Sequence, residues 1–168
     1  MENEIKFALR GYVELESLLT PFGWEDITQG YLNPNNRVRQ IIYPTGRREC
    51  LHTFKQRLPN GHNLEIESRI TAEQYDEAWE FTVERVTKRR IPIEYGDLVW
   101  DIDFYRWSYP WFVLAEVEMP PNMERPETIP PQLQEYLVYE VPRDDGRFAA
   151  RRLADESHVR RLAGELGL

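Results

Sequence analysis

The sequence predicts an α+β fold in which one antiparallel sheet is large enough to curl or close on itself. Three observations support this: roughly seven or eight segments of strand length, tight-turn sequences between most of them, and few stretches with helical periodicity. The chain has 168 residues, about one domain's length. No internal repeat or linker divides it, so we expect a single domain over residues 1–168.

The first half of the chain contains one expected helix among short strands. Val13–Phe22 places Leu15, Leu18, Leu19 and Phe22 on one helical face, and Pro21 and Gly23 end it. Turns are expected at 33–36, 45–46 and 59–61, from their Asn, Pro and Gly content. The expected strands are 1–8, 29–32, 37–43, 49–57 and 63–70.

The second half begins with a helix whose start is a capping box at Thr71–Gln74. Strands are expected at 84–93, 98–105 and 112–119. Pro120–Pro131 contains five of the twelve prolines and is expected to be a loop. A final amphipathic helix carries Val159 and Leu162 on its apolar face and ends at Gly167.

Composition and charge exclude several classes of protein. Hydrophobic residues are 41% of the chain, enough for a packed core. The net charge of −8 argues against a protein that wraps duplex DNA or lies on an anionic membrane. The longest apolar run, Trp111–Ala115, is far too short to span a bilayer. The lone Cys50 allows neither an internal disulfide nor a zinc site built from cysteines. With no visible secretory signal, we expect a cytoplasmic protein.

The most informative feature is the placement of charge on the strands. Residues two apart on a strand share a face, and many charged residues are spaced this way while apolar residues lie between them. The pairs are Glu2 and Glu4, Arg37 and Arg39, Glu65 and Glu67, Lys88 and Arg90, Asp101 and Asp103, and Glu116 and Glu118, with Lys6 extending the first and Lys55 following Thr53. For any single strand, the ordinary interpretation is a solvated face. Its repetition indicates a curved sheet whose charged face lines a tunnel.

Such a lining suits phosphoryl transfer. Lys and Arg hold a polyanion through charge-assisted hydrogen bonds. Carboxylates repel a polyanion unless a hard divalent cation lies between them, and Mg²⁺ or Mn²⁺ takes oxygen ligands. The cation then polarises a phosphoryl oxygen and positions the attacking water.

The order of the motifs resembles the CYTH superfamily, the triphosphate tunnel metalloenzymes. Glu2-Asn-Glu-Ile-Lys6 is similar to its ExExK signature. Later elements follow in the family's order as far as about residue 119: Gln29–Leu32 (QGYL), Arg37-Val-Arg39, Thr53-Phe-Lys55, Glu65-Ile-Glu67, Lys88-Arg-Arg90, Trp100–Asp103 and Leu114–Glu118 (LAEVE).

The resemblance implies a closed antiparallel eight-stranded β-barrel, with a tunnel through it and a few flanking helices. It implies Glu2, Glu4 and Glu118 as principal metal ligands, with Glu116 and Asp103 helping to hold the metals and the water. It further implies a basic grip on the triphosphate, made by Lys6, Arg37, Arg39, Lys55, Lys88 and Arg90, with Arg147 as a further phosphate contact. Glu65 and Glu67 would balance the bases or assist a second metal.

Four departures from the family pattern bear on substrate choice: Asn63 replaces an arginine, Arg89 a small residue, Tyr109–Phe112 a glycine-leucine turn, and Ala149–Ala150 an element containing Asn. The leading hypothesis is a hydrolase that uses Mg²⁺ or Mn²⁺ and acts on inorganic tripolyphosphate or an organic triphosphate. The alternatives are a class IV adenylate cyclase, which forms cyclic AMP from ATP, and a non-catalytic module that binds triphosphates or nucleotides. We expect a triphosphate-bearing small molecule as the partner, and a monomer or homodimer.

Overall fold

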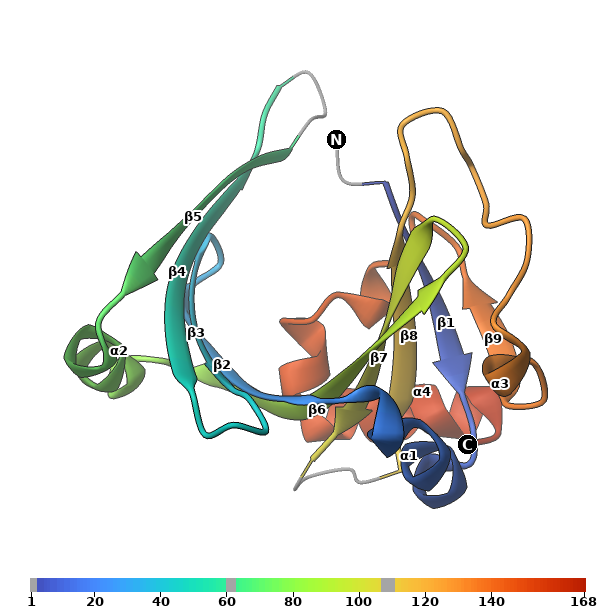
Figure 1. Cartoon of the computed structure of the whole chain (residues 1–168). Helices are drawn as coiled ribbons and strands as arrows, with labels where there is room; N and C mark the ends of the chain where they lie inside the picture. The colour runs from blue at the N-terminus through green and yellow to red at the C-terminus, as the bar shows by residue number, and fades with distance from the viewer. Residues whose placement is uncertain (1–2, 60–62, 107–110) are drawn as a thin grey trace.

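The computed structural model describes residues 3–59, 63–106 and 111–168. More of these residues lie in strands than in helices, and helices flank the sheet (Figure 1). The elements are β1 (Glu4–Leu9), α1 (Tyr12–Leu19), η1 (Thr20–Phe22), β2 (Glu25–Asn33), β3 (Asn36–Ile42), β4 (Arg48–Arg57), β5 (Asn63–Ile70), α2 (Ala72–Trp79), β6 (Glu84–Tyr95), β7 (Leu98–Tyr105), β8 (Val113–Glu118), α3 (Pro131–Gln134), β9 (Leu137–Val141), η2 (Gly146–Phe148), η3 (Arg152–Ala154) and α4 (Glu156–Leu166).

The strands of the described residues form one antiparallel sheet of nine strands, in the order β5-β4-β3-β2-β6-β7-β8-β1-β9. The sheet is strongly curved, and β4 and β5 face β8, β1 and β9 across its concave side (Figure 1). The register places Gln29 opposite Arg39, Arg90 opposite Asp103 and Lys6 opposite Glu116. Charged residues from distant parts of the chain therefore share the concave face.

The expectation of a closed eight-stranded barrel is wrong. β5 and β9 are the two edges of the sheet and do not pair with each other. A ninth strand, β9, was not predicted from the sequence; it pairs with β1 along Lys6–Leu9 and forms one edge. β5, the other edge, lies across the concave side from it (Figure 1), so the curvature of the sheet does not bring the two edges together. The result is an open, curved sheet with a cleft in place of a closed tunnel.

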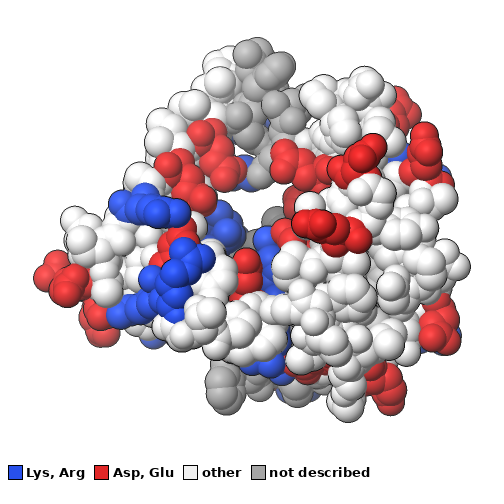
Figure 2. Space-filling model, in the orientation of Figure 1, with Lys and Arg blue, Asp and Glu red and all other residues white. Residues whose placement is uncertain are grey.

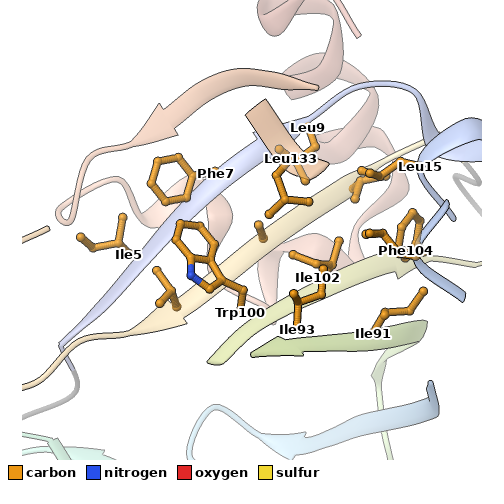
Figure 3. Close-up of a cluster of buried hydrophobic side chains, with 14 of the residues drawn as sticks. Ile5, Phe7, Leu9, Leu15, Ile91, Ile93, Trp100, Ile102, Phe104 and Leu133 are labelled. Carbon is orange, nitrogen blue, oxygen red and sulfur yellow. The ribbon is translucent and has the colours of Figure 1, made fainter. Parts of the chain in front are cut away.

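The main hydrophobic core lies on the convex face. Ile5, Phe7 and Leu9 of β1 face outward there, together with Trp100 and Ile102 of β7. Helices α1 and α3 cover them with Leu15, Leu19 and Leu133 (Figure 3). Trp100 is completely buried and stacks on Phe7, with ring centroids 5.5 Å apart. Burial of the apolar faces by outer helices leaves the charged faces on the concave side.

The concave face changes from charged to apolar along the strands of its β1–β8 side. Ala8, Tyr105 and Leu114 continue the inward-facing rows that carry Lys6, Asp103 and Glu116. Phe148 and Leu162, from the C-terminal elements η2 and α4, pack against these apolar residues. The C-terminal segment thus covers the apolar part of the concave face, and the charged part stays accessible.

Most expected elements are confirmed. Thr71 and Gln74 form the capping box of α2, which packs Tyr75 against Val38 and Cys50 on the outer face of the sheet. The first helix divides into α1 and the short η1, which contains Pro21. Leu18 and Phe22, expected on its apolar face, are exposed, because the change from α1 to η1 turns this segment away from the core. The loop over 120–130 and the final helix ending at Gly167 are also present. The expected turn at 59–61 lies partly outside the described residues.

One glycine has a clear packing requirement. A Cβ atom added at Gly30 would lie 2.7 Å from Cβ and Cγ2 of Thr82. β2 passes this close to the turn that joins α2 to β6, so only glycine fits without a shift of the backbone.

Over the described residues, no helix has the length and apolar character needed to cross a bilayer.

Candidate functional site

The charged rows of the concave face line a single cleft of about 680 Å³. Acidic and basic side chains surround a central opening of the molecule (Figure 2). We call this space the charged cleft. Its lining includes Glu4, Lys6, Gln29, Tyr31, Arg37, Arg39, Thr53, Lys55, Glu65, Glu67, Lys88, Arg90, Asp101, Glu116, Glu118 and Arg151. This lining includes every described residue that the sequence analysis proposed for the site, except Asp103 and Arg147. Asp103 is fully buried and lies beneath the side chains that line the cleft.

The β1–β8 wall of the cleft is built around Lys6. Its Nζ atom lies 2.6 Å from Oε1 of Glu116, the residue opposite it on β8, and 3.0 Å from Oε2 of Glu4. Glu4 is opposite Glu118 in the same ladder. Because residues two apart on a strand share a face, all four side chains are directed into the cleft.

The Lys6–Glu116 pair has strongly shifted protonation equilibria. Burial alone would lower the pKa of Lys6, but the carboxylates of Glu116 and Glu4 outweigh it and raise this pKa above its ordinary value. Burial would raise the pKa of Glu116, but Lys88, Lys6 and Arg90 hold it well below its ordinary value. Both groups are therefore charged at neutral pH.

The floor of the cleft is an ion network on β6 and β7. Asp103, fully buried, accepts hydrogen bonds from Lys88 Nζ and, at 2.7 Å, from Nε of Arg90. Arg90 also donates to Asp101 at 2.7 Å and to Glu116 at 3.0 Å. A buried charge without a partner is very costly, so these groups hold one another in place. Asp103 acts here as the buried anchor of two bases.

The opposite wall comes from β3, β4 and β5. Arg37 donates to Oγ1 of Thr53 at 3.3 Å, and Thr53 donates to Glu67 at 2.8 Å. Lys55 lies 3.5 Å from Glu65. Glu65 and Glu67 therefore each lie beside a basic side chain of this wall. This placement is consistent with the proposal that they balance the charge of the bases.

Arg39 differs from the other bases of the cleft. Its Nη2 atom donates to Oε1 of Gln29 at 3.3 Å, and within the described part of the chain no carboxylate forms an ion pair with it. The Nε atoms of Arg39 and Arg37 are both buried and have no hydrogen-bond partner there. Burial and the nearby charges of Arg37 and Arg90 lower the pKa of Arg39 to about 10. These unsatisfied cationic donors are what an anion would satisfy.

Two candidate residues are not placed in the cleft. Glu2 lies outside the described residues. Arg147 does not line the cleft, and its guanidinium pairs with Asp145 at 2.7 Å and with Glu165 at 2.7 Å. Arg89, one of the departures from the family pattern, faces away from the cleft, pairs with Asp26 at 2.7 Å and lies over the ring of Trp24.

Sequence reasoning missed several cleft residues. Gln29 and Tyr31 lie in a strand whose motif carried no assigned role, and Arg151 reaches the cleft from the C-terminal segment while pairing with Glu84 at 2.8 Å. Asp101 was recognised as one of the paired carboxylates but not as a site residue. Its position two residues before Asp103 on one strand, which places both carboxylates on the same face, could have identified it.

The described carboxylates supply part of a metal site. Glu4 and Glu118 place oxygen ligands on adjacent strands of the cleft wall, which is the ligand type that Mg²⁺ and Mn²⁺ take. Among the described residues, however, no group of three or more His, Cys, Asp or Glu side chains is close enough to hold an ion. The donor chemistry fits a divalent cation, and in this structure the Glu4 carboxylate pairs with Lys6.

The fold of the chain is similar to that of several solved structures. The chain matches no protein-family model and no curated protein. Among solved structures, it resembles the hypothetical protein NE1496, with 26% identity and a TM-score of 0.61 over 92% of this chain and 97% of that chain. A second structure, of the inorganic triphosphatase NE1496, gives 24% identity and a TM-score of 0.58 over 92% and 94%. An adenylate cyclase-like protein from Bacillus halodurans gives 15% identity and a TM-score of 0.50 over 74% and 82%.

These likenesses show that the chain shares the fold of these solved structures. They include both a triphosphatase and an adenylate cyclase-like protein. The likeness of fold therefore does not by itself choose between hydrolysis and cyclisation.

Proposed function

We propose that this chain is a divalent-metal-dependent hydrolase of triphosphates, acting on inorganic tripolyphosphate or an organic triphosphate. The observation that carries the proposal is the division of the charged cleft into two chemically different walls. On one wall, Arg37 and Arg39 each present a buried Nε donor that has no hydrogen-bond partner among the described residues. Glu4 and Glu118 present opposed carboxylates on the other.

Binding follows from the wall that carries Arg37 and Arg39. A triphosphate would satisfy their Nε donors, which folding has already removed from water. Lys6 and Arg90 are held by carboxylates in the structure and are close enough to the cleft to contact the same polyanion. The bases together would neutralise the substrate and orient its phosphate chain.

Hydrolysis requires the acidic wall. Glu4 and Glu118 would hold Mg²⁺ or Mn²⁺, which when bound supplies Lewis-acid polarisation of a phosphoryl oxygen and an activated water. Glu116 would keep Lys6 charged and directed into the cleft. Asp103 would fix Lys88 and Arg90 from behind, so the anion meets a rigid set of donors.

One observation favours a second candidate, a module that binds triphosphates without turnover. Lys6 bridges Glu4 and Glu116, so part of the acidic wall is already neutralised by a protein cation. A chain that only bound polyanions would have no need to release Glu4 from this bridge.

The test is to measure phosphate release from tripolyphosphate, ATP and thiamine triphosphate, with Mg²⁺, with Mn²⁺ and with chelator, and to analyse the ATP reaction for cyclic AMP. We expect metal-dependent phosphate release from at least one substrate. Cyclic AMP as the main product would favour the cyclase. Tight binding of tripolyphosphate with no turnover under either metal would favour the binding module and contradict the proposal.

A further inference from the structure

Gln29 is a buried polar residue to which the proposed function assigns no role. It is completely buried in β2, one of the inner strands of the sheet, and lies opposite Arg39 of β3. Both ends of its amide are engaged: Oε1 accepts from Arg39 at 3.3 Å, and Nε2 donates to the hydroxyl of Tyr31 at 3.3 Å. An amide held at both ends has a fixed orientation.

The partner of Arg39 is unusual for this cleft because it is neutral. Lys6, Lys88 and Arg90 each contact carboxylates that cancel much of their charge. Arg39 contacts an amide oxygen, which orients the guanidinium without adding negative charge. Arg39 therefore has no carboxylate as an ion-pair partner within the described part of the chain, and burial together with Arg37 and Arg90 lowers its pKa by more than Glu67 and Asp103 raise it.

We infer that Gln29 is a positioning residue that orients Arg39 toward the charged cleft while leaving its charge available to the substrate anion. This rests on the proposed function, because the anion is the triphosphate. A carboxylate at this position would pair with Arg39 and compete with the substrate. An apolar side chain of the same length would leave the guanidinium unoriented and one of its donors unsatisfied.

Gln29→Glu separates this role from a purely structural one. The change keeps the shape of the side chain and adds one negative charge, which the surrounding arginines keep ionised. We expect the variant to unfold in urea at a midpoint equal to or above that of the wild type, because an ion pair is gained. Calorimetry should nevertheless show about a tenfold or greater loss in tripolyphosphate affinity. KM should rise by a similar factor while kcat changes little.

Gln40→Glu is the matched control. Gln40 follows Arg39 on β3, so its side chain lies on the opposite face of the sheet. Gln40→Glu adds the same negative charge as Gln29→Glu, on the strand that carries Arg39 but on the face away from it. We expect this control to bind tripolyphosphate with an affinity close to that of the wild type.

Gln29→Met is the second variant if Gln29→Glu does not fold. It removes both hydrogen bonds and should raise KM severalfold with kcat nearly unchanged.

The outcomes separate the two proposals. Wild-type affinity in Gln29→Glu, or equal weakening by Gln29→Glu and Gln40→Glu, would overturn the role of Gln29 and leave the proposed function standing. If Gln29→Glu does not fold, wild-type KM in Gln29→Met would overturn it. A wild-type chain that neither binds nor hydrolyses tripolyphosphate would overturn the proposed function and this inference together.

Discussion

Lys6 lies between Glu4 and Glu116, with its ammonium 3.0 Å from one carboxylate and 2.6 Å from the other. If Glu4 holds the proposed divalent cation, Lys6 and the metal ion would compete for this carboxylate. A triphosphate would relieve the competition, because its oxygens offer Lys6 another partner.

Removal of this ammonium should strengthen metal binding while weakening catalysis. We predict that Lys6→Gln binds Mn²⁺ about tenfold more tightly than the wild type in the absence of substrate, because Glu4 is released from its ion pair. Tripolyphosphate hydrolysis should fall in the same variant. Mn²⁺ titration followed by electron paramagnetic resonance measures the affinity. Arg37→Gln, which removes one positive charge from the cleft without touching Glu4, is the control, and equal tightening in both variants would contradict the competition.

The buried anchor of the cleft floor should contribute strongly to stability. Asp103→Asn leaves Lys88 without its carboxylate in a fully buried position, so we expect a loss of about 3–5 kcal/mol in the free energy of unfolding. Urea unfolding followed by tryptophan fluorescence measures it. Asp101→Asn removes a partly exposed partner of Arg90 and should cost only about 1 kcal/mol. Similar costs for the two variants would show that Asp103 is not the anchor.

Glu116 should make the fold sensitive to acid. Its pKa lies below its ordinary value of 4.5, so between the two values the native state binds fewer protons than the unfolded state. Stability from this group is present above pH 4.5 and is lost as the pH falls toward the native pKa. We expect Glu116→Gln to be less stable than the wild type at about pH 7, with the difference narrowing by about pH 3. Urea midpoints across this range provide the check, and a constant difference would exclude the linkage.

The contact of Gly30 with Thr82 should make this glycine intolerant of substitution. Gly30→Ala forces a Cβ to within 2.7 Å of the threonine side chain and should cost about 1–3 kcal/mol of stability. Gly164→Ala in α4, where an added Cβ meets nothing within 4 Å, should instead stabilise by about 0.5–1 kcal/mol. Thermal unfolding should show a lower Tm than the wild type for Gly30→Ala and a higher Tm for Gly164→Ala.

The charged concave face could be predicted because alternation along a strand is a local signal. Each pair, such as Glu116 and Glu118, shows in three consecutive residues which face of the strand is polar. The capping box of α2 is local in the same way. The resemblance added the order of the motifs, which no single strand contains.

The remaining features depend on tertiary context. β9 has only five residues, and its partly exposed edge position gives it weak hydrophobic alternation. The wrong expectation of a closed barrel came from the resemblance, and the pattern of a single strand does not show whether the two edges of a sheet meet. Arg147 was assigned to the substrate by resemblance, but its ion pairs with Asp145 and Glu165 depend on how η2 packs near α4. The role of Gln29 depends on its register opposite Arg39, which a single strand sequence does not reveal.

The central claim is that the acidic wall of the cleft makes it a metal-dependent hydrolase. The most direct measurement compares phosphate release from tripolyphosphate by the wild type and by Glu4→Gln, with Mn²⁺ or Mg²⁺ present and after confirming equal urea midpoints. We predict metal-dependent release by the wild type and a loss of about a hundredfold or more in the variant, because one carboxylate ligand is replaced by a neutral amide. Full hydrolysis by Glu4→Gln, or release by the wild type that continues in chelator, would contradict the account.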